Sequence, residues 1–344
     1  MALEKLFARS PRSVSVTGVA NDLVRCDLYI WNDPATIPTN PTLTLSKPIP
    51  STLATTVYFN VSPYVRNYIE HTSFTEIASQ AVVPVANYCY CTAKTYLNGT
   101  LQATSEFICF DGYGYFEEGY NPIYNNVFLS AGDFYVKEND NGGSVSVFVN
   151  SLTTLEARYT QLGTGATTNV ALSGIIKQVP MVHTSYIATG NTLSIFNTSG
   201  SVTLATFIFT TQCEPRYTPI ECDFVNKFGV WQRLIFFKAK RDNIEVSGSD
   251  WKLMPDSPIY NTLVGYNKFM NINGNASVKI NTGWVEENNS EAIQQLMLSE
   301  VILLDNKPVK IKTKSIEKVK KINDKMINYS MEFDYANDII NNVM

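Results

Sequence analysis

Short runs of alternating apolar and polar residues, separated by turn-forming residues, occupy the first 110 positions of the chain. The strand-like runs are SVSVTG, VRCDLYIW, TLTLSK, TTVYFNV, VANYCYCTAKTYL and ATSEFICF, all rich in β-branched and aromatic residues. Asn98-Gly99 separates the last two, and this dipeptide is typical of a two-residue hairpin turn because both of its positions need positive φ. The pattern predicts an immunoglobulin- or fibronectin-like β-sandwich over residues 1–112.

One segment of this region has helical spacing instead. In SPYVRNYIEH, Ser62 can cap a short helix and Pro63 suits its first position. Val65, Tyr68 and Ile69 then fall on one face. We expect a helix of one to three turns that covers an end or an edge of the sandwich.

The middle of the chain is also strand-like but has very little charge. The runs are VFLSAGDFYV, SVSVFVN, LEARYTQL, TNVALSG, IIKQVPMVHTSY, TLSIFNTSG and SVTLATFIFTT. Within residues 141–213 the charged side chains are Glu156, Arg158 and Lys177 alone. We expect a β-domain over residues 113–216 whose Thr-, Ser- and Asn-rich surface lies against neighbouring subunits.

The last part, residues 217–344, combines β-type runs with one helical pattern. Phe224, Trp231 and residues 234–237, 278–280 and 331–335 are β-type. Asn288 followed by Glu291 resembles a capping box, and Ile293, Leu296 and Met297 follow at helical spacing. A helix of about three turns cannot bury this stripe alone, so it should lie across the flanking strands. The fold class predicted overall is mainly β: β-sandwich domains followed by an α+β unit with one helix on an antiparallel sheet.

Composition narrows the classes of function. The 344 residues are 44% hydrophobic and 17% charged, with 27 basic and 31 acidic residues and a net charge of −4. A dedicated nucleic-acid binder is normally basic, so direct contact with DNA is not expected. The charged start MALEKLFARSPRSV does not fit a signal peptide, and no apolar run approaches the ~18 residues of a membrane span.

The six cysteines lack the paired spacing of a zinc site, and we expect them to be small buried hydrophobes. They are Cys26, Cys89, Cys91, Cys109, Cys213 and Cys222.

The segment FDGYGYFEEGYNPIYNN, residues 110–126, alternates glycines with aromatic residues. The candidate interaction residues in it are Tyr113, Tyr115, Phe116 and Tyr120. Such a composition is typical of recognition loops. Three interpretations stay open: a connector that packs its aromatics between domains, a contact between subunits, and a saccharide-binding loop. The last requires Tyr113 or Tyr115 to be exposed on a rigid surface.

A second candidate surface is a lysine stripe. Lys310, Lys312 and Lys314 alternate with apolar or neutral residues, so they should lie on one face of a strand. Such a stripe can be a solvated face or protect a sheet edge, face an acidic protein partner, or face DNA.

No pattern of a known catalytic site occurs. His71 and His183 have no cysteine or carboxylate at metal-binding spacing, and no HExxH, GxSxG or phosphate-loop motif is present. The adjacent pairs Glu117-Glu118 and Glu286-Glu287 point to different faces, so adjacency alone does not build a glycosidase site. We therefore expect no enzyme activity, no metal and no cofactor.

Several blocks carry a resemblance to a protein family. VNKFGVWQRLIFF, GWVEENNSEAIQQLMLSE and NDKMINYSMEFDYANDIINNV lie in the last third. CDLYIWND, TLTLSKPIP, YFNVSPYVRNYI and FDGYGYFEEGYNP lie before it. They resemble uncharacterised virion structural proteins of tailed bacteriophages and prophages of Bacteroidetes-type hosts, including crAss-like phages.

This resemblance covers most of the length in patches and implies a part of a virion, with no catalytic residues to carry over. The expected role is a baseplate, tail-tip or adaptor subunit of the tail, assembled in the host cytoplasm. Its expected partners are other virion proteins and copies of itself in a ring. The alternatives are a capsid decoration, a connector ring between portal and tail, and a module that binds host-surface carbohydrate.

Overall fold

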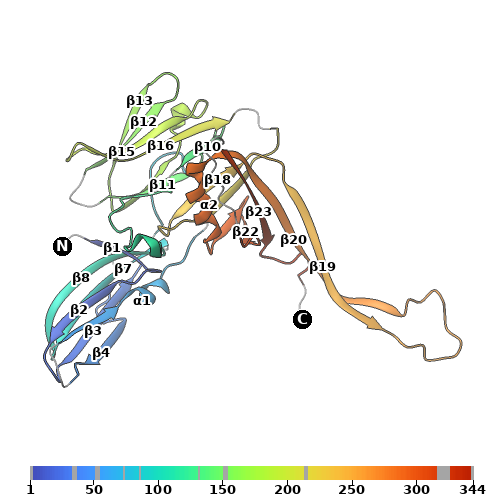
Figure 1. Ribbon diagram of the computed structural model, residues 1–344, viewed down its shortest axis with the longest axis horizontal. Helices are drawn as coiled ribbons and strands as arrows, with labels where there is room; N and C mark the ends of the chain where they lie inside the picture. The colour runs from blue at the N-terminus through green and yellow to red at the C-terminus, as the bar shows by residue number, and fades with distance from the viewer. Residues whose placement is uncertain are drawn as a thin grey trace.

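The computed structural model describes residues 3–32, 37–50, 55–72, 74–84, 87–130, 132–149, 154–212, 216–315 and 326–341. The described chain is mainly β, as predicted, and its strands form several separate sheets (Figure 1). The immunoglobulin or fibronectin type, the α+β class of the last part and the boundaries at residues 112 and 216 stay predictions.

The first part of the chain forms two packed sheets. Its strands are β1 (Glu4–Phe7), β2 (Ser13–Gly18), β3 (Leu23–Trp31), β4 (Leu43–Pro48), β5 (Thr55–Asn60), β6 (Ala81–Val82), β7 (Tyr88–Leu97) and β8 (Thr100–Phe110). One sheet has the order β1-β8-β7-β3-β4, with β1 parallel to β8, and β2 pairs with β5 in the other. Val14 and Val16 alternate inward from β2 and pack with Leu28 and Phe107 from the larger sheet.

The turn between β7 and β8 and the described cysteines agree with the sequence-based expectations. Asn98 and Gly99 both have positive φ, 49° and 84°, so the predicted hairpin turn between β7 and β8 is confirmed. Cys26, Cys89, Cys91, Cys109 and also Cys222 of the last part are free and buried, as expected of small hydrophobes; Cys213 lies outside the described residues.

The predicted short helix is present as α1 (Ser62–Arg66), but Ser62 does not cap it. The capping position is Val61, and Ser62 lies within the helix. The Ser62 hydroxyl instead donates to the carbonyl oxygen of Ser10 at 2.6 Å and accepts from the amide of Arg12 at 2.9 Å. The side chain therefore ties the helix to the segment before β2.

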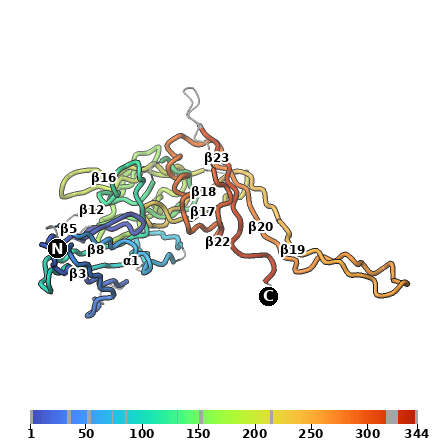
Figure 2. The backbone as a smooth tube through the Cα atoms, turned by 60° about the horizontal axis from the view of Figure 1, so that its bottom comes forward, coloured from blue at the N-terminus to red at the C-terminus, as the bar shows by residue number. Residues whose placement is uncertain are grey.

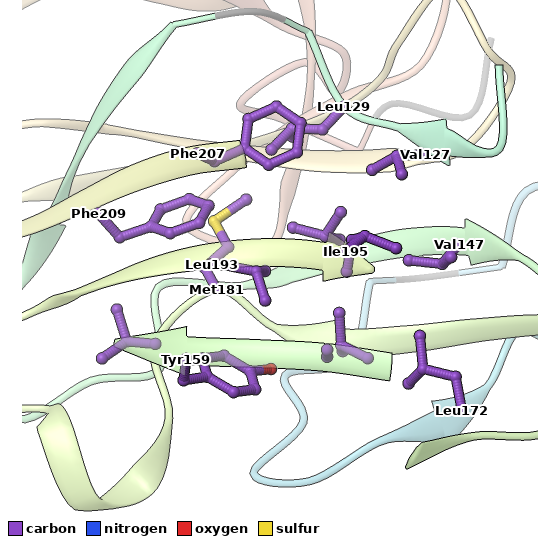
Figure 3. Packing of buried hydrophobic residues seen from close by; sticks show 14 of the residues in the cluster. Val127, Leu129, Val147, Tyr159, Leu172, Met181, Leu193, Ile195, Phe207 and Phe209 are labelled. Carbon is purple, nitrogen blue, oxygen red and sulfur yellow. The ribbon is translucent and has the colours of Figure 1, made fainter. Parts of the chain in front are cut away.

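The middle part forms a second pair of packed sheets. Its elements are the 3₁₀ turns η2 (Phe116–Glu118) and η3 (Thr184–Tyr186), and the strands β9 (Val127–Phe128), β10 (Asp133–Lys137), β11 (Ser144–Phe148), β12 (Leu155–Gln161), β13 (Thr167–Leu172), β14 (Ile176–Pro180), β15 (Asn191–Asn197) and β16 (Val202–Gln212). The sheets have the orders β6-β14-β11-β9 and β10-β16-β15-β12-β13. Tyr159, Leu193, Ile195 and Phe209 of one sheet pack toward Val147 of the other (Figure 3).

The last part forms one seven-stranded sheet with a helix on it. Its elements are β17 (Ile220–Val225), β18 (Trp231–Phe236), β19 (Arg241–Lys252), β20 (Asn267–Glu286), η4 (Glu287–Asn289), α2 (Ser290–Met297), β21 (Ile302–Leu304), β22 (Lys307–Ile311) and β23 (Met326–Tyr335). The order is β18-β17-β21-β22-β23-β20-β19. Ile293 and Leu296 of α2 pack on Phe224 and Phe333, so the predicted stripe lies against the flanking strands.

The capping box predicted for this helix is absent. The capping position is Asn289, which makes no side-chain hydrogen bond to the helix, and α2 has eight residues, about two turns. The Asn288 amide donates to Asp133 at 3.1 Å, and Glu291 accepts from Lys227 at 2.7 Å. Both residues therefore link α2 and the turn before it to neighbouring elements, and neither caps the start of the helix.

Two features join the three parts of the chain. Strand β6 comes from the first part but pairs with β14 of the middle part. A separate cluster, called here the junction core, takes Phe7 and Phe110 from the first part, Phe128 and Phe148 from the middle and Phe228 from the last. Phe128 and Phe228 stack at a ring-centroid distance of 5.6 Å.

Candidate assembly interface

The hairpin of β19 and β20 extends away from the rest of the molecule (Figure 1, Figure 2). β20 pairs with β23 from Ser277 onward and with β19 alone between Asn267 and Ala276. Every residue of β19 is exposed. We call residues 243–275 the arm.

The arm carries large apolar side chains that the described parts of its own chain leave exposed. Along its strands Ile244, Val246, Trp251, Phe269 and Met270 are exposed, and at its tip Met254, Ile259, Tyr260 and Leu263 are exposed. Leu263 and Ile259 keep 91% and 87% of their surface accessible. Exposed apolar surface marks interaction sites when it is extensive, because soluble monomers rarely leave large apolar patches open.

The arm also has an unpaired strand edge. β19 is the last strand of its sheet, so one row of its backbone amides and carbonyls has no partner strand. Such an edge is a template for pairing with another chain. An isolated two-stranded hairpin is marginally stable in water. Both facts favour a second molecule against the arm.

The tip, residues 253–266, is an ordered turn. The Leu253 amide donates to the carbonyl of Tyr266 at 2.7 Å, which continues the ladder of the hairpin. The side chain of Asn261 accepts from the amide of Leu263 at 2.9 Å. Asp256 is the only charged residue in the tip. The tip therefore presents an apolar surface with one carboxylate.

The tyrosine–glycine segment does not lie on the arm but at the junction of the three parts. The amide of Tyr113 donates to the carbonyl of Lys227 at 2.7 Å, and the Lys227 ammonium lies 4.8 Å from the centroid of the Tyr115 ring. Both tyrosines are half-buried, and burial raises the pKa of Tyr113 to about 12. They pack between elements as a connector does, and they do not form the exposed platform that sugar stacking requires.

The other aromatic residues of this segment face outward. Phe116 is fully exposed, and Tyr120 and Tyr124 are also exposed. Of the four predicted interaction residues, Tyr113 and Tyr115 therefore pack inward, whereas Phe116 and Tyr120 are exposed to solvent.

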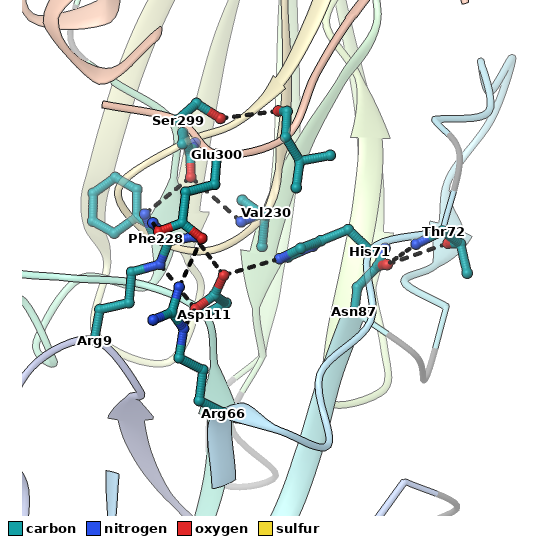
Figure 4. A network of polar contacts seen from close by, with 12 residues as sticks. Arg9, Arg66, His71, Thr72, Asn87, Asp111, Phe228, Val230, Ser299 and Glu300 are labelled. Atoms are coloured by element: carbon teal, nitrogen blue, oxygen red, sulfur yellow. Dashed lines mark hydrogen bonds and ion pairs between the residues drawn. The ribbon is translucent and has the colours of Figure 1, made fainter. Parts of the chain in front are cut away.

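A cluster of charges beside this segment, which sequence analysis missed, links the first and last parts (Figure 4). Asp111 accepts from Arg9 at 2.6 and 2.9 Å, from Arg66 at 3.2 Å and contacts His71 at 3.3 Å. Glu300 forms ion pairs with the same two arginines at 3.2 and 2.7 Å. The sequence separation of more than 180 residues between Asp111 and Glu300 left no local pattern to find.

The environment of Asp111 keeps it ionised. Burial alone would raise its pKa, but the hydrogen bonds from Arg9 and His71 and the charges of Arg9 and Arg66 outweigh burial and hold the pKa well below its ordinary value.

A second buried cation is paired in the same way. Arg233 in β18 donates to Asp223 at 2.8 and 3.1 Å and lies 3.0 Å from Glu221 and 3.7 Å from Glu76. A hydrogen bond with Asp140, together with burial, raises the pKa of Glu76 to about 7.

The predicted stripe on one strand face is wrong, because Lys310 lies in β22 while Lys312 and Lys314 follow it, and the sheet-edge interpretation does not hold either. β22 lies between β21 and β23 in the interior of the seven-stranded sheet. Lys312, just after β22, is 3.0 Å from both Glu245 and Glu332, and hydrogen bonds to these two carboxylates raise its pKa. Lys310 and Lys314 are exposed.

Both histidines of the described chain make structural contacts. His183 caps η3 by accepting from the Ser185 amide at 3.2 Å, and His71 belongs to the Asp111 cluster. Within the described ranges no group of three His, Cys, Asp or Glu side chains could hold a metal ion. The helices described there are all too short or too polar to span a bilayer.

Comparisons with known proteins give no relatives: no family model, curated protein or solved structure matches the chain.

Proposed function

We propose that this chain is a structural subunit of a tailed-bacteriophage virion and belongs to the tail, as a baseplate, tail-tip or adaptor-ring component. It acts through contacts with other virion proteins and with copies of itself. The proposal assigns it no catalytic step, metal or cofactor. It includes immunoglobulin- or fibronectin-like sandwiches followed by an α+β unit.

The exposed apolar arm is the observation that carries this proposal. An enzyme or a monomeric carrier gains nothing from an apolar hairpin held away from its body, and such a surface promotes aggregation unless a partner covers it. A subunit of an assembly has that partner. The resemblance of several sequence blocks to virion proteins gives the class of assembly.

Gold labelling of purified phage particles with an antibody against this chain tests the proposal. Label at the tail supports it. Label on the head surface or at the head–tail neck supports instead the alternatives of a capsid decoration or a connector ring. Particles that lack the chain contradict every virion role.

A second candidate function rests on the exposed aromatic rings at residues 116–124. Phe116, Tyr120 and Tyr124 are open to solvent and could stack on sugars, which would make the chain a host-surface carbohydrate-binding module. A glycan array with the natural chain and with Phe116→Ser and Tyr120→Ser variants tests it. Binding that both substitutions remove supports this function, and a flat array with the natural chain rejects it.

A further inference from the structure

The molecule has a hollow on the side away from the arm. Two adjoining cavities of about 480 and 360 Å³ share Tyr124 and Asn126 in their walls. Both volumes lie within the range of about 300–1,000 Å³ that is usual for pockets that hold a ligand. We call the combined cavity the Tyr124 groove.

The lining of this groove combines apolar and charged side chains. Ile123, Phe148, Leu129 and Phe207 supply apolar surface, and the ion pairs Arg12–Glu4 and Lys227–Glu291 also lie in its walls. A further cation there is Lys5 of β1, which is only 8% exposed. Its ammonium donates to the carbonyl of Asn125 and, at 2.6 Å, to the amide oxygen of Asn126.

Lys5 differs from the other buried cations of the molecule. Arg233 and Lys227 each form an ion pair with a carboxylate, at 2.8 and 2.7 Å. Among the described residues no carboxylate lies within ion-pair distance of Lys5; the neighbouring Glu4 pairs with Arg12. Burial lowers the pKa of Lys5 to about 8. A buried charge without a counter-charge is costly.

The arm tip has the complementary properties. It exposes the apolar side chains of Met254, Ile259 and Leu263, and its single charge is the exposed carboxylate of Asp256, which has no ion pair among the described residues. The tip cannot reach the groove of its own chain. At about 3.3 Å per residue, the strands between residues 267 and 273 carry it a further 20 Å or so from Gly274. The first and second views place β1 and the arm on opposite sides (Figure 1, Figure 2).

We propose that the arm tip of one copy of this chain docks in the Tyr124 groove of the next copy, with Asp256 against Lys5. The occupant is a second copy because β1 and the arm lie on opposite sides of the molecule, as a head-to-tail contact requires (Figure 1, Figure 2). The apolar side chains in both the tip and the groove, and the opposite charges of Asp256 and Lys5, which have no ion pair among the described residues, support the same occupant. Repetition of this contact generates a closed ring or a filament.

This inference rests on the proposed role in an assembly and names the contact that would build it. The inference can be wrong while the virion role is right. Gold label at the tail, together with no contact between tip and groove, would reject the inference and leave the virion role intact. Absence of the chain from particles rejects the virion role, whatever the isolated chain does.

Photo-crosslinking of the full-length chain tests the contact. A benzoylphenylalanine at position 263 in the tip is the probe, and equal amounts of unlabelled and ¹⁵N-labelled chain are mixed before irradiation. We expect the probe to crosslink to peptides that contain residues 1–12 or 122–126. In part of these crosslinks one peptide should come from an unlabelled chain and the other from a labelled chain, which shows that the contact is between two copies. The matched control carries the probe at position 19, another exposed apolar site, and should give no such crosslinks. Crosslinks elsewhere on a copy, crosslinks to a different protein, or no crosslinks overturn the proposal.

Charge substitutions give a second, independent readout by sedimentation. Asp256→Lys lies on an exposed turn, so it leaves the fold intact. We expect it to raise the dissociation constant of self-association by at least about tenfold, equivalent to 1.4 kcal/mol. Asp256→Asn should have a smaller effect in the same direction, and that effect should disappear when Lys5→Met is present in the same chain. Equal association by the Asp256→Lys chain and the natural chain rejects the pairing.

Discussion

The junction of the three parts and the arm differ in which side chains they bury and which they expose. The junction buries charged side chains, and Asp111, Arg9 and Arg233 all have ionic partners there. The arm exposes apolar side chains such as Val246 and Leu263, which the described residues of the same chain leave largely open to solvent. A buried charge requires a partner, and an exposed apolar surface favours one.

The difference lies in where the partner is. The partners at the junction come from distant parts of the same chain, so the junction fixes how those parts sit together. In the proposed assembly, the partner of the arm lies outside the chain. Lys5 shares features of both regions, because it is buried like a junction residue but has no carboxylate partner among the described residues. Substitutions in the two regions should therefore have very different effects on folding.

The largest effect on folding should come from Asp111→Asn. The substitution keeps the shape but removes the charge that holds Arg9 and Arg66, and breaking a buried ion pair costs about 3–5 kcal/mol. Urea denaturation at pH 7 measures this loss of unfolding free energy. The control is Asp242→Asn, in an exposed pair with Lys240 at 3.5 Å, which should change stability little.

The pH dependence of this variant follows from the low pKa of Asp111. Because the folded-state pKa lies below the unfolded value of about 3.9, the carboxylate stabilises the fold above that pH and loses this effect as the pH falls. The difference in stability between the natural chain and the Asp111→Asn chain should therefore shrink below about pH 4. A constant difference down to pH 2 would contradict the assigned role.

Lys5→Met should change how stability depends on pH. The folded-state pKa of about 8 lies below the unfolded value of 10.5, so the natural chain should gain stability as the pH rises through this window. The gain should be roughly 2–4 kcal/mol, and the Lys5→Met chain should lack it. Denaturation from pH 7 to 10.5 measures it, with residues 253–266 replaced by Asn-Gly in both chains so that assembly does not contribute. Parallel curves for the two chains would show that Lys5 is not a desolvated cation.

Gly229→Ala should destabilise the junction. Gly229 has φ +76°, and a Cβ there would lie 2.6 Å from the amide nitrogen of Asp111. The strained backbone alone costs about 1–3 kcal/mol, and the contact adds to that. Gly163→Ala is the matched control, since it has φ +91° and open space around it. Thermal unfolding should show a larger loss at position 229; equal losses would mean that the close approach is unimportant.

The smallest effect should come from Val246→Thr on the arm. An exposed substitution of this kind changes stability by less than about 0.5 kcal/mol. The same change at Val147, which is fully buried, places a hydroxyl in the core and should cost about 1–3 kcal/mol. Chemical denaturation of the tip-replaced chain compares the two. Equal costs would mean that the arm folds against its own chain.

Local pattern was enough to predict much of the fold. The alternation in SVSVTG, the Asn98-Gly99 turn and the stripe of Ile293 and Leu296 each reflect contacts within a few residues or with one sheet face. These signals depend on period and turn chemistry, which the sequence contains directly.

Strand order and exposure could not be predicted in the same way. The alternation in RDNIEVSGSDWK is the same whether β19 is covered or open, so the arm has no local signature. The sequence could not decide whether the lysine stripe lies at a sheet edge, because the place of β22 in its sheet depends on distant strands. The Asp111 cluster likewise joins residues from far apart in the chain.

Light scattering coupled to size exclusion tests the central claim, that the arm of this chain is covered by another copy, most directly. The natural chain should elute as an oligomer with a mass several times its 38.4 kDa, and the chain with Asn-Gly in place of residues 253–266 should elute as a folded monomer. Lys252 and Asn267 face each other across the hairpin, so this two-residue turn closes it without strain. A natural chain that is monomeric at every concentration, or a tip-replaced chain that assembles equally well, would contradict the account.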